Sequence, residues 1–198
     1  IDSRGQVAFV KRPVRHYTVG PTTLVVWDGT SISVIGNGKV RSEVRFPVDP
    51  GVSALSVSDT ELFVGFSDGS LEQFRLNDPL HTRRQILLAE GSGQAVVSLL
   101  PGPREIMFVG FADGLWGMWN TASGRMYYRD WLHGPVTGLL RHGDTLYAVS
   151  SLGGSAAVPL GTLTMSYCGL LERIWRDTPV VWTHDGIQKA AKPTHHPC

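Results

Sequence analysis

A short motif that occurs twice at a fixed distance is the strongest constraint on the fold of this chain. Phe63-Val-Gly-Phe-Ser-Asp-Gly69 returns as Phe108-Val-Gly-Phe-Ala-Asp-Gly114 after a step of 45 residues. A related Asp28 precedes Asp68 by 40 residues, and Gly153 follows Gly114 by 39 residues. Four copies at this spacing form an internal repeat, which predicts a structure built from similar stacked units.

The composition and the turn signals predict short strands within each unit. The chain has 23 glycines and 12 prolines, which favour strands joined by tight turns. The pairs Asp28-Gly29, Asp68-Gly69 and Asp113-Gly114 suit hairpins, because both residue types tolerate positive φ, so we assign all six a turn role. We predict strands at residues 6–10, 14–19, 22–27, 31–35, 40–48, 52–57, 62–66, 71–76, 86–89, 96–100, 106–111, 115–119, 126–131, 136–140, 146–150 and 156–160.

A single sheet of about 40 residues cannot bury both of its faces, so neighbouring sheets must cover one another. We therefore predict an all-β fold over residues 1–160, a β-propeller of about four four-stranded blades. The Phe-Val-Gly-Phe runs are expected to be inner strands packed on both faces. A sandwich of short strands is the alternative fold, but it gives no reason for a motif repeated at a fixed step.

Two accounts of the number of blades remain open. Because the chain begins with Ile1 rather than Met, we expect it to be part of a larger propeller with further blades in a longer polypeptide. In the other account, the strand at residues 6–10 pairs with the fourth unit and closes a small ring.

The pattern changes after Leu160. Within residues 165–175, apolar residues recur at the spacing of one helix face, and Pro179 follows as a stop signal. We predict a short helix plus a strand extension at residues 161–186, packed on the propeller, and a flexible tail at residues 187–198.

The unit resembles the WD-repeat family over residues 14–160. The resemblance is carried by the hairpin aspartates Asp28, Asp68 and Asp113, by Trp119-Asn120 at the Trp-Asp position, and by Leu132-His-Gly-Pro-Val136 in the loop before a first strand. It implies four-stranded blades in which a loop His bonds the turn Asp of its own blade.

The chain departs from that family pattern at the histidine. His133 belongs to the unit whose turn reads Leu152-Gly153, while Asp49 and Gly93 stand where the other units would need a His. We therefore expect the family's hydrogen-bond network to be absent and the chain to be a degenerate relative.

The net charge and the number of cysteines limit which partners and which cellular compartment we expect for the protein. With 18 basic and 17 acidic residues, the net charge of +1 gives no field that attracts nucleic acid or an anionic membrane. No apolar run approaches the roughly 18 residues of a membrane span. The two cysteines, Cys168 and Cys198, suit a reducing compartment, so we predict a cytoplasmic protein in which Cys168 is buried.

No catalytic or cofactor site emerges from the sequence. There is no Gly-x-Ser-x-Gly elbow, no phosphate loop and no paired carboxylate, so we predict no enzyme activity and no cofactor. His195, His196 and Cys198 form the one metal-like cluster, but a structural zinc site needs four ligands, so the tail is predicted to bind no metal.

These observations favour a non-enzymatic propeller that scaffolds or senses proteins within a larger polypeptide. Its partner would be another protein or the remainder of the same polypeptide. Loops at blade ends carry contacts in such folds, and Trp131 and His133 before Val136 are the candidate binding residues. The other tryptophans, Trp116, Trp119, Trp175 and Trp182, are expected mainly to pack between blades.

Two other functions remain open. One is a regulatory propeller attached to a catalytic part (a protease, kinase or NTPase) outside this sequence. The other is a propeller hydrolase with a site in the central channel. Such a site would need polar residues on the inner strands, and the residues at those positions are apolar.

Overall fold

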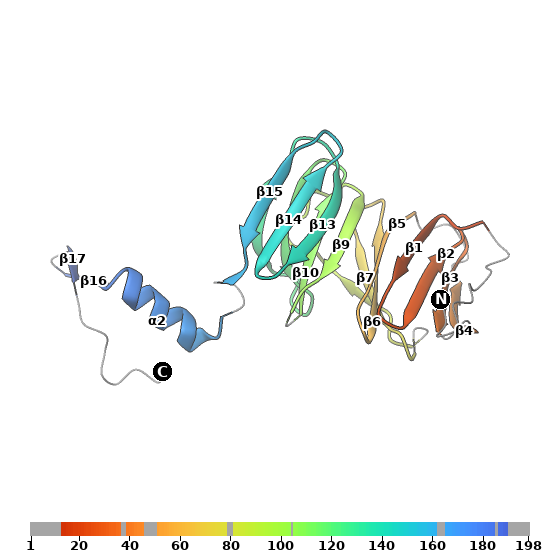
Figure 1. Cartoon of the computed structure of the whole chain (residues 1–198), viewed down its shortest axis with the longest axis horizontal. Helices are drawn as coiled ribbons and strands as arrows, with labels where there is room; N and C mark the ends of the chain where they lie inside the picture. The colour runs from red at the N-terminus through yellow and green to blue at the C-terminus, as the bar shows by residue number, and fades with distance from the viewer. Residues whose placement is uncertain are drawn as a thin grey trace.

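The computed structural model describes residues 13–36, 39–45, 51–78, 81–103, 105–161, 165–184 and 186–189. Four antiparallel sheets follow one another along the chain, and the strands of each sheet pair in sequence order (Figure 1). This all-β architecture, with a short helix near the C-terminal end of the described residues, agrees with the coarse prediction from the sequence.

The first two sheets have four strands each. The first sheet contains β1 (His16–Val19), β2 (Thr23–Trp27), β3 (Ser31–Gly36) and β4 (Lys39–Arg45). The second contains β5 (Val52–Val57), β6 (Glu61–Phe66), β7 (Leu71–Arg75) and β8 (Arg84–Ile86). The predicted strand at residues 86–89 is therefore displaced, since β8 ends where that prediction begins.

The third sheet also has four strands, and the fourth has three among the described residues. The third contains β9 (Val96–Pro101), β10 (Ile106–Phe111), β11 (Leu115–Asn120) and β12 (Met126–Trp131). The fourth contains β13 (Val136–His142), β14 (Thr145–Ser150) and β15 (Ser155–Pro159). The predicted strand at residues 6–10, which could have completed this sheet, lies outside the described residues.

The sheets stand face to face in an open row. β1 packs beside β5, β5 beside β9, and β9 beside β13, so the first strands of successive sheets are neighbours. Figure 1 shows the first and fourth sheets at opposite ends of the row. The described strands therefore form no closed ring, and closure of the predicted propeller is not seen.

The repeated Phe-Val-Gly-Phe runs form the second strands, β6 and β10, and each of these strands also contacts the first strand of the next sheet. The prediction that they pack on both faces is confirmed. Val64 belongs to the cluster shared with the first sheet, and Phe63 belongs to the cluster shared with the third. Alternation of side chains along a strand sends neighbouring residues into opposite cores.

Two glycines let the sheets approach closely. A Cβ placed on Gly65 would lie 2.5 Å from Cγ1 of Val96, and one placed on Gly110 would lie 2.5 Å from Cγ1 of Val136. Both valines begin the first strand of the next sheet and are fully buried. The repeat therefore conserves a glycine of β6 and β10 because a valine of the next sheet fills the space above it.

The segment after the fourth sheet contains α2 (Tyr167–Asp177) and a hairpin of β16 (Val180–Thr183) and β17 (Gly186–Lys189). The hydroxyl of Ser166 caps the helix by accepting a hydrogen bond from Gly169 N at 3.1 Å. The predicted tail therefore starts too early, because residues 187–189 belong to β17.

The position of α2 differs from the prediction that it packs on the sheets. No residue of α2 is buried, and Figure 1 shows the helix apart from the row. Cys168 is exposed, so the prediction that it is buried is wrong.

The close approach at Gly110 can be tested by adding one methyl group. We expect Gly110→Ala to lower the free energy of unfolding by about 1–3 kcal/mol, because the new Cβ overlaps the buried Val136. Val136→Ala removes Cγ1 but keeps the Cβ atom, which would lie 2.7 Å from the new methyl group, so the double variant should recover only a small part of this loss. Chemical denaturation of all three variants provides the measurement.

Gly138→Ala is the matched control for that experiment. Its Cβ would meet only Cγ2 of the largely exposed Val149, at 3.1 Å, so a smaller loss is expected. Additive effects of Gly110→Ala and Val136→Ala would contradict the proposed contact.

Candidate functional site

The three repeated aspartates hold the hairpin turns between the second and third strands. The Oδ1 atoms of Asp28 and Asp68 accept hydrogen bonds at 2.9 Å from the backbone N–H two residues later, and Asp113 does so at 3.1 Å. The following Gly29, Gly69 and Gly114 have φ values of 99°, 85° and 93°. The geometry is that expected for the turn role assigned from the sequence.

The second of these turns carries an additional bond. The Ser70 hydroxyl donates to Asp68 Oδ1 at 2.6 Å, beside the bond from Ser70 N. These two bonds from Ser70 hold the pKa of the Asp68 carboxyl below its ordinary value of 3.8.

The predicted binding residues Trp131 and His133 lie at the end of β12 and just beyond it, and both are exposed. The backbone carbonyl of His133 accepts a bond of 2.6 Å from the Ser150 hydroxyl, which fixes the loop to the fourth sheet. No hydrogen bond joins the His133 ring to a turn aspartate among the described residues, as the departure from the family pattern predicts. His133 therefore positions the loop through its backbone.

Trp131 is held by charged neighbours on its own strand and on the adjacent loop. The guanidinium of Arg129 lies 5.7 Å from the ring centre of Trp131, and Arg129 Nη1 lies 3.2 Å from Glu90 Oε2. Trp131 N also donates to Asp130 Oδ1 at 2.8 Å. We call Glu90, Arg129 and Trp131 the Trp131 patch.

Strand β12 presents a different environment on its other face. Tyr128 packs edge-on against Trp116, with ring centres 5.5 Å apart. Burial raises the pKa of the Tyr128 hydroxyl, and the nearby Asp130 carboxylate raises it further. The strand thus joins the core of the third and fourth sheets through Tyr128 and exposes Trp131.

The other predicted tryptophans divide in a similar way. Trp116 and Trp119 are fully buried between sheets, as expected for packing, and Trp119 Nε1 donates to Ala89 O at 2.8 Å. Trp175 lies on α2, apart from the sheets, and is half-buried. The side chain of Trp182 lies outside the described side chains, so its packing stays a prediction.

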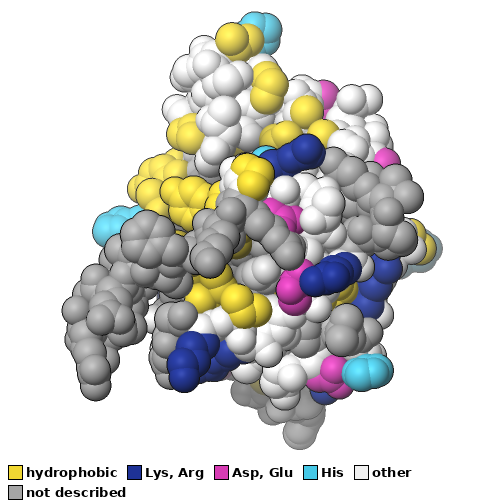
Figure 2. Space-filling view, turned by 90° about the vertical axis from the view of Figure 1, so that its right-hand side faces the viewer, with side chains coloured by type: hydrophobic (Ala, Val, Ile, Leu, Met, Phe, Trp, Pro, Cys, Tyr) yellow, Lys and Arg dark blue, Asp and Glu magenta, His cyan; other side chains and the backbone are white. Residues whose placement is uncertain are grey.

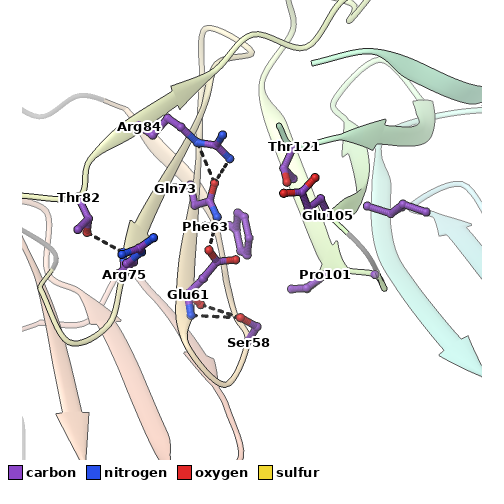
Figure 3. Close-up of a pocket in the computed structure, with 12 residues that line it drawn as sticks. Ser58, Glu61, Phe63, Gln73, Arg75, Thr82, Arg84, Pro101, Glu105 and Thr121 are labelled. Carbon is purple, nitrogen blue, oxygen red and sulfur yellow. Dashed lines mark hydrogen bonds between the residues drawn. The ribbon is translucent and has the colours of Figure 1, made fainter. Parts of the chain in front are cut away.

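A cleft between the second and third sheets was not predicted from the sequence. It has a volume of about 490 Å³ and is lined by Ser58, Glu61, Phe63, Gln73, Arg75, Thr82, Arg84, Pro101, Gly102, Glu105, Ile106 and Thr121 (Figure 3). One signal could have indicated it, since Gln73 lies between Leu71 and Phe74, and it is only 9% exposed in the structure. A buried amide needs hydrogen-bond partners, and its partners line the cleft.

The described residues offer no metal centre. No group of three or more His, Cys, Asp or Glu side chains converges within the described ranges. The candidate metal ligands His195, His196 and Cys198 lie outside them, so that alternative is not tested. No helix in the described part of the chain is long and apolar enough to cross a membrane.

Comparisons with known proteins find similarity only at the level of the fold. No family model and no curated protein matches the chain. The crystal structure of the computationally designed Ika4 protein is similar with a TM-score of 0.61 and 18% identity, over 78% of this chain and 98% of that one. The computationally designed Ika8 protein gives 0.58 and 17%, over 74% of this chain and 45% of that one. At these identities the likeness supports the arrangement of sheets and carries no function.

The bond from the Ser70 hydroxyl gives a test of the second turn. We expect Ser70→Ala to raise the pKa of Asp68 towards 3.8, because the largest cause of its lowering is removed. Carbon-detected NMR titration of the Asp68 carboxyl measures this pKa directly. Ser70→Thr keeps a hydroxyl and should retain the low value.

The same bond sets the sign of a pH effect on stability. Because the folded pKa of Asp68 is depressed, its contribution to stability is present above the unfolded pKa and is lost as the pH falls through the folded pKa. Ser70→Ala should therefore reduce the loss of stability on acidification below about pH 4. Equal titration curves for the Ala and Thr variants would contradict the assignment.

Proposed function

We propose that this chain is a non-enzymatic protein-interaction module of the β-propeller type, related to the WD repeats, that contacts a protein partner through the Trp131 patch. The open row of face-to-face sheets supports the propeller proposal, because each sheet buries a face that it could not bury alone. The proposed partner is another protein or the remainder of the same polypeptide.

The observation that carries this proposal is the exposure of Trp131 to solvent. Its side chain is 54% exposed although it belongs to a strand whose other face enters a core. Leaving a large aromatic surface in water is unfavourable, and Trp and Arg are the residue types most enriched at binding hot spots. Arg129 and Glu90 hold the indole in place, so little conformational freedom would be lost on binding.

The charge distribution supports a protein partner. On the face shown in Figure 2, Lys and Arg side chains lie among Asp and Glu side chains rather than in a patch of one sign. The net charge of +1 agrees with this mixture and disfavours nucleic acid or an anionic membrane as the partner. The cytoplasmic location stays a prediction, and no observation on the described residues favours the regulatory or hydrolase alternatives.

The proposal is tested by truncating the indole. We expect Trp131→Ala to lose a partner that the unaltered chain retains in affinity capture, with an affinity about 30-fold lower, as for a typical hot spot. Quantitative mass spectrometry of the captured proteins, followed by calorimetry with the purified partner, provides the measurement.

Tyr17→Ala is the matched control, because Tyr17 is an exposed aromatic residue (69%) on the first sheet, far along the row. The control should capture the same partners as the unaltered chain. If the Trp131 variant also retains every partner at unchanged affinity, the patch is not the binding surface. Thermal unfolding of both variants checks that neither result comes from loss of folding.

A further inference from the structure

The cleft between the second and third sheets is a separate place on the molecule from the Trp131 patch. In the third sheet Leu115 pairs with Trp131, whereas Trp119 pairs with Met126 at the other end of the same strands. The cleft is lined by Ile106 and Thr121, so it lies at that other end. Its volume of about 490 Å³ is within the range of small-molecule sites.

On the wall formed by the second sheet, hydrogen bonds run from a cationic donor through an amide to a carboxylate acceptor. Nε and Nη2 of Arg84 donate to Gln73 Oε1, and Gln73 Nε2 donates to Glu61 Oε1 at 2.5 Å. The amide of Gln73 is thus satisfied at both ends, which fixes the guanidinium and the carboxylate on either side of it. Glu61 Oε2 takes no part in these bonds and can accept a further donor.

The wall from the third sheet contributes Glu105 and Thr121. Figure 3 shows both across the cleft from Glu61, Gln73 and Arg84. Thr121 N donates to Glu105 O at 2.7 Å, which holds the backbone of Glu105 at its positive φ of 61°. A glutamate in this conformation costs free energy, and the hydrogen bond to Thr121 keeps it at the cleft.

Among the described residues that line the cleft, the formal charges cancel. Arg75 and Arg84 line the cleft together with Glu61 and Glu105, so cations and carboxylates both face one small volume. An anion would be attracted by the two arginines and repelled by the two glutamates, and a cation would show the reverse. A ligand that carries both charges can bind the arginines and the glutamates at once. The hydroxyls of Ser58, Thr82 and Thr121 add neutral donors and acceptors.

We propose that this cleft binds a small zwitterion that carries an ammonium and a carboxylate group, such as a short peptide. The ammonium group donates to Glu61 and Glu105, and the carboxylate group accepts from Arg75 and Arg84. The Gln73 bridge keeps Glu61 and Arg84 from forming a direct ion pair that would close the site. This inference does not depend on the protein-interaction proposal.

The test uses L-alanyl-L-alanine and two blocked derivatives. The N-acetyl derivative lacks the ammonium group, and the C-terminal amide lacks the carboxylate. We expect the free dipeptide to shift the backbone NMR signals of Gly102 and Thr121 with a dissociation constant on the order of 1 mM. Each derivative should bind about tenfold more weakly, because one charge-assisted set of bonds is lost.

Two variants locate the ammonium end. Glu105→Gln should weaken the free dipeptide about tenfold, but it should not weaken the anionic N-acetyl derivative, because that ligand loses a repelling carboxylate. Glu90→Gln is the matched control, because Glu90 is also an exposed glutamate at positive φ (57°) but lies in the Trp131 patch. Its titration should equal that of the unaltered chain.

Three results would overturn the inference. The dipeptide could leave the Gly102 and Thr121 signals unchanged at about ten times the expected dissociation constant. It could bind no better than its blocked derivatives, or Glu105→Gln could behave like Glu90→Gln. Far-ultraviolet circular dichroism and thermal unfolding confirm that each variant is folded before these results are compared.

Discussion

The burial of one sheet by the next is the interaction on which the rest of this structure depends. A four-stranded antiparallel sheet has two faces, and β6 and β10 are apolar on both. Val96 and Val136 fill the spaces above Gly65 and Gly110, which brings successive sheets into contact at equivalent points. The Ser53 hydroxyl adds a bond of 2.6 Å to Val96 O, so a polar link accompanies the apolar one.

The repeat allowed most of the fold to be predicted, because its signals are local. Alternation of side chains and Asp-Gly turns depend only on neighbours in sequence, and the strands at Val52–Val57, Ile106–Phe111 and Met126–Trp131 have the predicted bounds. The errors fall where local signals are weak. β8 shares only Ile86 with the strand predicted at residues 86–89, and the tail predicted from residue 187 overlaps β17.

The candidate site was only partly predictable for a related physical reason. Trp131 could be chosen from the sequence because the end of its strand is predicted from neighbouring residues alone. The cleft is assembled from Glu61, Gln73 and Arg84 on one sheet and Glu105 on the next, and their relation depends on how the sheets pack. The position of α2 could not be predicted for the same reason. An apolar face on a helix indicates that the helix has a partner, but the sequence does not show which surface that partner is.

The open ends of the row make the sheets unequal. The second and third sheets are covered on both faces, whereas the fourth leaves Leu140, Tyr147 and Val149 in water. In a linear array with nearest-neighbour coupling, a terminal member is stabilised by one interface and an internal member by two. Local unfolding should therefore begin at the first and fourth sheets and travel inward, with amide protons of β14 exchanging before those of β10.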